Sequence, residues 1–156
     1  MSRQRRLHSA PLAVAVLLGL SLNPAWGLAE TYRGEFDPCP FTPATRADVA
    51  GVGTFTASLD GATLTIHGTF SELASPATAA HLRMGLAMGV PGGVIGDLTV
   101  AHETAGTVSG SISLSPEQVA ALHRNAIYIQ IDDTRAPAGA IWAWIVTGQE
   151  PIGRAR

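Results

Sequence analysis

The sequence contains no lysine, and after residue 6 it contains no cluster of basic residues. Its 10 arginines are outnumbered by 12 acidic residues, and loss of residues 1–29 would remove three arginines and no acids, changing the net charge from -2 to -5. A mildly acidic chain without basic clusters is not typical of proteins that bind nucleic acid or an anionic membrane surface. We therefore expect a protein or a small ligand as the partner.

Cysteine is almost absent, since Cys39 is the only one. No internal disulfide can form, and no second cysteine or nearby histidine stands at the spacing of a metal or haem site. Cys39 also lies well beyond the N-terminal apolar run, which argues against lipid attachment there. We expect a partly buried structural thiol, with an intermolecular disulfide as the alternative.

The chain has no apolar run of the roughly 20 residues that a membrane-spanning helix needs. Three of its first six residues are arginines, residues 10–22 are apolar, and small residues follow around Gly27 and Ala29. This order predicts a secretory signal peptide over residues 1–29, cleaved after Gly27 or Ala29, and a secreted or periplasmic protein. An uncleaved anchor is the alternative. General secretion is favoured over a twin-arginine signal because His8 stands where an apolar residue is expected.

Motifs for common catalytic chemistry are also missing. No serine lies in a Gly-x-Ser-x-Gly turn, so the sequence does not favour a serine hydrolase. Gly92 and Gly93 lack the lysine and the following helix that would make them a phosphate-binding loop. We therefore predict no catalytic residues.

Alternation of apolar and polar residues begins after an aperiodic lead-in segment, residues 30–49, and continues through a single domain over residues 50–147. Phe55, Ala57 and Leu59 alternate with hydroxyl residues, and Asp60-Gly61 then predicts a hairpin turn. His67 falls on the polar face of the second strand, so we expect it to face solvent. Residues 148–156 are predicted to be a loose tail.

The same alternation predicts further strands around residues 107–114, 127–132 and 141–146, and a short apolar run covers residues 94–100. One short helix is indicated, because Ser115 is a suitable N-cap, Pro116 suits the first helical position and Gln118 completes a capping box. Many short strands and a single short helix predict an all-β sandwich or barrel.

Four histidines of the domain could bind a metal: His67, His81, His102 and His123. None is two or four residues from another, the spacing that presents two imidazoles to one ion from a single strand or helix. We therefore predict no metal site and no cofactor. A copper or zinc site that uses His81 with some of the others is the alternative.

Four segments, in order, resemble the CHRD domain, the module repeated in chordin and found singly in secreted bacterial proteins: "GVGTFTASLDGATLTIHGTFSEL", "ATAAHLRMG", "GGVIGDL" and "NAIYIQIDDTRAPAGAIWAWI". The resemblance covers about residues 50–147 and implies a secreted β-sandwich that acts in binding or as a scaffold. The family's histidine placement is in turn similar to that of copper/zinc superoxide dismutase, which implies an immunoglobulin-like or superoxide-dismutase-like Greek-key sandwich and leaves a redox protein as the alternative function.

The sequence departs from the family pattern where a metal would bind. His81 keeps the first histidine of a His-x-His pair, whereas Arg83 replaces the second, and Asp132 replaces a later strand histidine. An arginine among the ligands would repel a cation. The resemblance places Arg83 and Asp132 close together, so we predict that an ion pair replaces the metal.

Aromatic residues mark the surface that we predict to be functional. Trp142 and Trp144 point to the same side of the last strand, and Tyr128 on the neighbouring strand can extend that face. These aromatics either belong to a covered core or form an exposed interaction surface. We predict a non-catalytic binding or scaffold module whose surface consists of Arg83, Asp132, Tyr128, Trp142 and Trp144.

Overall fold

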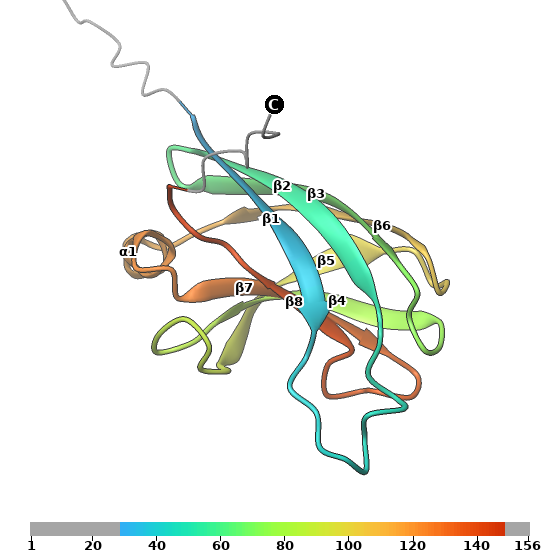
Figure 1. Ribbon diagram of the computed structural model, residues 1–156. Helices are drawn as coiled ribbons and strands as arrows, with labels where there is room; N and C mark the ends of the chain where they lie inside the picture. Colours follow the sequence, from blue (N-terminus) through green and yellow to red (C-terminus); the bar gives the residue numbers. More distant parts are fainter. Residues whose placement is uncertain (1–28, 149–156) are drawn as a thin grey trace, which may run out of the picture.

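The structure, a computed structural model, describes residues 29–148 (Figure 1). The predicted signal peptide, except Ala29, and the predicted tail, except Gly148, lie outside the described residues. The described part contains eight strands and one helix: β1 (Glu30–Pro38), β2 (Val52–Asp60), β3 (Thr63–Ser71), β4 (Ala77–Met84), β5 (Gly93–Val100), β6 (Gly106–Ser113), α1 (Pro116–His123), β7 (Ile127–Asp133) and β8 (Ile141–Trp144).

The strands form a closed antiparallel barrel in the order β1-β2-β3-β6-β5-β4-β7-β8. The prediction of an all-β fold with one short helix is confirmed, but a closed barrel stands where a two-sheet sandwich was predicted. The barrel closes through β1 and β5, because each of these strands pairs with a different neighbour at its end than along the rest of its length. The end of β1 pairs with β8 through Asp37 and Pro38, and the end of β5 pairs with β6 through Thr99 and Val100.

The core fills the barrel from alternating positions of every strand. Phe55, Ala57 and Leu59 of β2 point inward and are buried, as their alternation predicts. The hairpin between β2 and β3 turns at Gly61, whose φ of 60° lies in the left-handed region that glycine adopts without strain. His67 of β3 is exposed, as predicted.

Strand β1 occupies the segment that was predicted to be an aperiodic lead-in, so that prediction is wrong for residues 30–38. Tyr32 and Phe36 point into the core, and Gly34 lies between them on the same face. A Cβ at Gly34 would lie 2.6 Å from the Phe55 ring, which packs edge-on against Phe36. A glycine is therefore required at the inward position, and it conceals the alternation of β1 in the sequence.

Helix α1 has the ends that the sequence predicts. The Ser115 hydroxyl accepts a hydrogen bond from the Gln118 amide, and the Gln118 side chain accepts one from the Ser115 amide, which completes a capping box. Within residues 29–148 no helix is long and apolar enough to cross a membrane.

Candidate functional site

Strand β7 is buried on both of its faces. Its inward residues Ile127, Ile129 and Ile131 belong to the core, whereas Tyr128 and the two residues that follow at alternate positions point away from it. These outward side chains are nevertheless 0% (Tyr128), 6% (Gln130) and 8% (Asp132) exposed. A second layer therefore covers the barrel wall at this strand.

Loops form this second layer and border a cavity of about 380 Å³ between themselves and the outer wall of β4, β7 and β8. Its floor comes from outward residues of these three strands, and its walls come from the segment after β1, the β4–β5 loop and the β7–β8 loop. The lining residues are Cys39, Pro40, Thr45, Asp48, Val49, Arg83, Pro91, Tyr128, Gln130, Arg135, Ala136, Pro137, Ala138, Gly139 and Trp142.

Three aromatic rings pack together at the floor of the cavity. The ring centroid of Tyr128 lies 5.7 Å from that of Trp142 and 4.4 Å from that of Trp144, and the two tryptophans are 5.5 Å apart. The strand pairing explains the cluster, since Tyr128 stands opposite Trp144 and Gln130 stands opposite Trp142. Both tryptophans are half-buried, so they are neither closed core nor a freely exposed patch.

Arg83 and Tyr128 are held by one glycine of the β4–β5 loop. The Arg83 Nε donates a hydrogen bond to the Gly92 carbonyl at 3.0 Å. The Tyr128 hydroxyl accepts one from the Gly92 amide at 3.0 Å and donates to the Gly92 carbonyl at 3.4 Å. These bonds occupy the polar end of the tyrosine and fix the stem of the arginine, and the two residues form one side of the cavity.

The predicted ion pair between Arg83 and Asp132 is wrong for the described structure, because no such pair lies within 4.0 Å. Arg83 pairs with Tyr128 in the β4–β7 register, whereas Asp132 pairs with Ala79, four residues away along β4. That offset separates the two Cα positions by about 13 Å along the strands. Asp132 also does not line the cavity.

Asp132 is instead engaged by its neighbours on β7 and β4. Its Oδ1 accepts a hydrogen bond of 2.7 Å from Gln130 Nε2, and its Oδ2 lies 3.6 Å from His81 Nε2. The other ring nitrogen of His81 lies 2.9 Å from Asp97 on β5. His81 therefore sits between two carboxylates, and Asp132 has its partners without Arg83.

The outer wall of the cavity carries a second charged pair and the thiol. Arg135 and Asp48 form an ion pair with a 2.6 Å contact, which joins the β7–β8 loop to the segment after β1. Cys39 is buried, as predicted, and its amide donates to the Ala140 carbonyl at 3.0 Å. Burial, and secondarily the nearby Asp132 carboxylate, raises the pKa of the Cys39 thiol to about 12. The thiol is therefore neutral at physiological pH.

Asp133 shapes the loop that forms this wall. Its side chain is fully buried, and its carboxylate accepts hydrogen bonds from the backbone amides of Ser75 at 3.3 Å, Arg135 at 2.9 Å and Ala136 at 2.6 Å. Two of these donors lie two and three residues after Asp133, so the aspartate stabilises its own turn, a common use of this residue type. The turn places Arg135 and Ala136 at the cavity.

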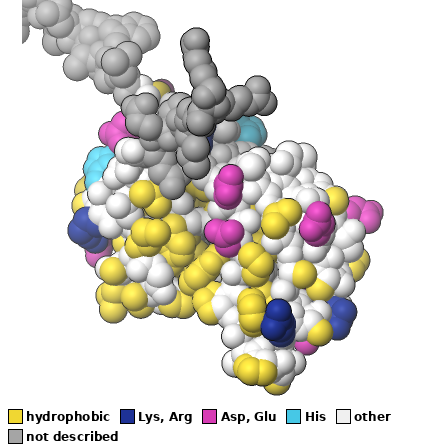
Figure 2. Space-filling view, in the orientation of Figure 1, with side chains coloured by type: hydrophobic (Ala, Val, Ile, Leu, Met, Phe, Trp, Pro, Cys, Tyr) yellow, Lys and Arg dark blue, Asp and Glu magenta, His cyan; other side chains and the backbone are white. Residues whose placement is uncertain are grey.

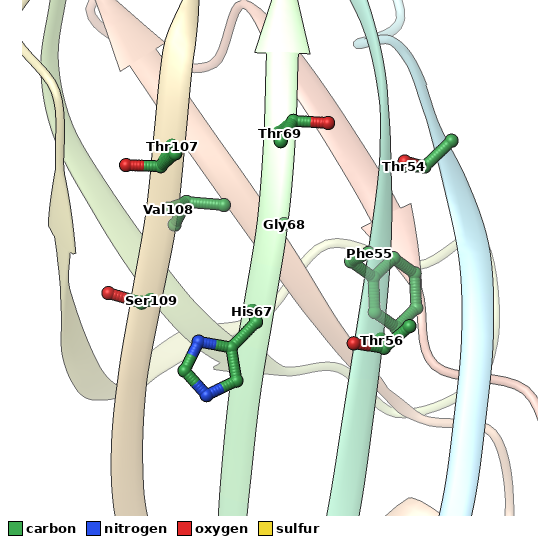
Figure 3. A pocket seen from close by; sticks show the side chains of 9 residues that line it. All are labelled: Thr54, Phe55, Thr56, His67, Gly68, Thr69, Thr107, Val108 and Ser109. Carbon is green, nitrogen blue, oxygen red and sulfur yellow. The ribbon is translucent and has the colours of Figure 1, made fainter.

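The four candidate metal-binding histidines are not brought together. His67 projects from the outer face of β3 with the hydroxyl residues around it, as Figure 3 shows. His102 contacts the Ala77 carbonyl at 3.0 Å, and His123 contacts Glu30 at 3.1 Å. Within residues 29–148 no three His, Cys, Asp or Glu side chains are grouped so that they could hold one ion.

A second hollow of about 500 Å³ lies on the opposite sheet, over β2, β3 and β6 (Figure 3). Gly68 lies among its lining residues, between His67 and Thr69 of β3. Its rim consists mainly of threonine and serine hydroxyls, with His67 as its one titratable side chain. This open hollow lacks the charged wall and the cluster of tyrosine and tryptophan rings found at the loop-covered cavity.

An exposed apolar loop adjoins the cavity. Leu86 is 90% exposed, and Met88, Val90 and Val94 are also exposed. In Figure 2 hydrophobic side chains gather at the lower left, over the β4–β5 loop that Figure 1 shows in the same place. Pro91 and Gly92 of this loop reach the cavity and its arginine. The rim on this side is therefore apolar.

Of the five predicted surface residues, Arg83, Tyr128 and Trp142 line the cavity, Trp144 packs against the rings of Tyr128 and Trp142 without lining it, and Asp132 lies outside it. The sequence did not indicate that Asp48 and Arg135 form the opposite wall, since nothing in their positions shows that they meet. Gln130 of β7 also lines the cavity. Its amide donates to Asp132 and to the Ala138 carbonyl, which ties the floor to the wall.

The fold and the site define a small all-β barrel domain with a loop-covered cavity on its outer wall. Residues 37–142 match the family model of the CHRD domain, from the end of β1 into β8. This match spans well over half of the chain, and the chain belongs to the CHRD domain family. No curated protein and no solved structure matches the chain.

Proposed function

We propose that this CHRD domain is an exported, non-catalytic binding module and that the loop-covered cavity is its ligand site. The observation that carries the proposal is that β7 is buried on both faces. The loops that cover its outer face border a cavity of about 380 Å³ beside an aromatic cluster. Ligand sites are typically concave and mainly apolar, with a few polar groups that orient the ligand. This volume lies near the lower end of the range of about 300–1,000 Å³ for such sites.

The wall chemistry supports binding rather than catalysis. Tyr128 and Trp142 offer ring surfaces, and Pro40, Pro91 and Pro137 add rigid apolar walls. A cysteine at the cavity wall could act as a nucleophile only as a thiolate. Burial raises the pKa of Cys39 to about 12, so this thiol is not ionised at neutral pH. The predicted signal peptide supports export. This can be tested by measuring the mass of the protein recovered outside the cytoplasm, which should correspond to cleavage after Gly27 or Ala29.

Binding can be tested with an uncharged fluorescent probe of apolar surfaces, N-phenyl-1-naphthylamine. We expect saturable fluorescence enhancement with the wild-type protein and a loss of at least ten-fold in affinity for Trp142→Ala. His67→Ala is the matched control, because it alters the other hollow and leaves the cavity intact.

A measurement on the unmodified protein guards against misfolding of the variant. In a ¹⁵N-labelled sample the probe should shift the indole N–H resonance of Trp142 and the side-chain amide of Gln130, while the backbone amides of Thr54 and Thr69 stay in place. Shifts confined to the threonine hollow, or no saturable binding, would contradict the proposed site.

A further inference from the structure

The cavity contains an arginine whose charge the described part of the protein does not balance. The Arg83 Nε donates to the Gly92 carbonyl, which is a neutral acceptor. Within residues 29–148 no carboxylate lies within 4.0 Å of Arg83. Arg83 is only partly exposed and lies at the side of a covered cavity. A half-buried cation without a counter-ion is costly, and a ligand can remove this cost by supplying the negative charge.

The neighbouring groups do not neutralise it. Asp48 is paired with Arg135, so those two charges cancel each other at the opposite wall. Asp132 does not line the cavity, and the strand register places its Cα about 13 Å from that of Arg83. Cys39 is a neutral thiol, since burial raises its pKa to about 12. The lining of the cavity therefore carries one net positive charge, and that charge is on Arg83.

The surroundings of Arg83 indicate what accompanies the negative charge. Tyr128 and Trp142 line the same cavity, and the hydroxyl of Tyr128 is already occupied by Gly92. Both aromatics therefore offer apolar ring surface to a ligand. Among residues 29–148 no hydrogen-bond partner contacts the terminal guanidinium nitrogens of Arg83, and such a group matches the planar fork of a carboxylate.

We infer that the ligand is a small organic acid whose carboxylate pairs with Arg83 and whose apolar body, about one ring in size, packs against Trp142 and Tyr128. The inference rests on the proposed binding function and specifies the ligand class for the same cavity. The size follows from the modest volume, which suits a single-ring compound better than a long lipid.

A pair of probes that differ only in charge tests this inference. 3-Phenylpropionate is ionised at neutral pH, and 3-phenylpropionamide is its uncharged analogue of nearly equal shape. Both are titrated into ¹⁵N-labelled protein, and binding is followed by the Trp142 indole resonance and the Arg83 Nε–H resonance. We expect the acid to bind about ten-fold more tightly than the amide, as one charge-assisted hydrogen bond requires.

Two arginine variants locate the charge effect. Arg83→Gln retains hydrogen-bond donors but loses the charge, so it should reduce the affinity for the acid to that for the amide. Arg124→Gln is the matched control, because Arg124 caps the end of α1 and does not line the cavity. It should leave the preference for the acid unchanged.

The outcomes separate this inference from the proposed function. Equal affinity for acid and amide, or an acid preference that survives Arg83→Gln, would overturn the inference and leave the binding function in place. Binding of N-phenyl-1-naphthylamine without binding of either phenyl compound would also overturn the inference alone. Failure of all three compounds to bind would overturn both.

Discussion

Removal of the Asp133 carboxylate should be among the most destabilising single changes in this domain. The Asp133→Ala substitution takes away the acceptor for three backbone amides, those of Ser75, Arg135 and Ala136. The Arg135 amide retains a second acceptor, the Ser75 hydroxyl at 2.9 Å. The other two amides lose the side-chain acceptor that they have in the native structure, at a site where the aspartate itself is 0% exposed.

The magnitude follows from these two donors. A buried donor left without an acceptor costs about 1 to 3 kcal/mol. For two donors the sum is about 2 to 6 kcal/mol. Partial relaxation of the loop toward water should keep the cost in the lower half of this range, so we expect a loss of about 3 kcal/mol in the free energy of unfolding. For a domain of this size that corresponds to a decrease of roughly 10 °C in the melting temperature.

The assay is urea unfolding followed by far-ultraviolet circular dichroism, together with a thermal melt. Asp97→Ala is the matched control, because the Asp97 side chain is 84% exposed and contacts only His81 among the described residues, so its loss should cost less than about 1 kcal/mol. Asp133→Asn, which keeps an oxygen acceptor, should fall between the two. If Asp133→Ala costs no more than Asp97→Ala, the assignment of the loop's stability to this carboxylate is refuted.

Three further outcomes are expected. Gly92→Ala should destabilise the domain by about 1 to 3 kcal/mol in denaturant titrations, because a Cβ there would collide with the Met84 carbonyl. Gly93→Ala is the control, since a Cβ at Gly93 meets nothing within 4 Å. Equal effects of the two substitutions would contradict this prediction. Ser115→Ala should lower stability by about 1 kcal/mol through loss of the helix cap, and a neutral effect in the same titration would contradict the role of the capping box. The Cys39 thiol should react with a disulfide reagent at pH 8 at least about 100-fold more slowly in the folded than in the unfolded protein. Because folding raises its pKa from 9.0 to about 12, the stability contributed by the protonated thiol should be complete below pH 9 and be lost as the pH rises toward 12, and fast native-state labelling would contradict this.

The strands that the sequence predicted well have at least three apolar residues at alternate positions, even where a glycine such as Gly68 or Gly110 interrupts them. Phe55, Ala57 and Leu59 reveal their strand because each contributes a side chain to the core at every second position. β1 was missed because it has only two such residues, Tyr32 and Phe36, and they are separated by Gly34, where the ring of Phe55 takes the space of the absent side chain. The alternation of apolar side chains in the sequence does not reveal an inward position whose space is filled by a residue of another strand.

The candidate site was predictable only in its floor. Tyr128 and Trp142 could be found because neighbouring strands bring alternate residues to one face. The walls come from segments without regular structure, and the meeting of Asp48 with Arg135 depends on how two loops fold over the barrel. The ion pair of Arg83 with Asp132 failed for a related reason, since the strand register separates residues that the family pattern places near each other. Register between distant strands depends on the whole barrel.

The short seam between β1 and β8 has a mechanical consequence for the cavity. Only Asp37 and Pro38 pair across it, and the chain passes directly from this seam to Cys39, while Trp142 lies on the other side. A ligand that contacts both Cys39 and Trp142 would bridge the β1 side and the β8 side of this seam. Since a ligand that prefers the closed barrel must oppose its opening, occupancy should slow hydrogen exchange of the amides along this seam. Exchange at the β5–β6 seam, which lies away from the cavity, would serve as the internal reference.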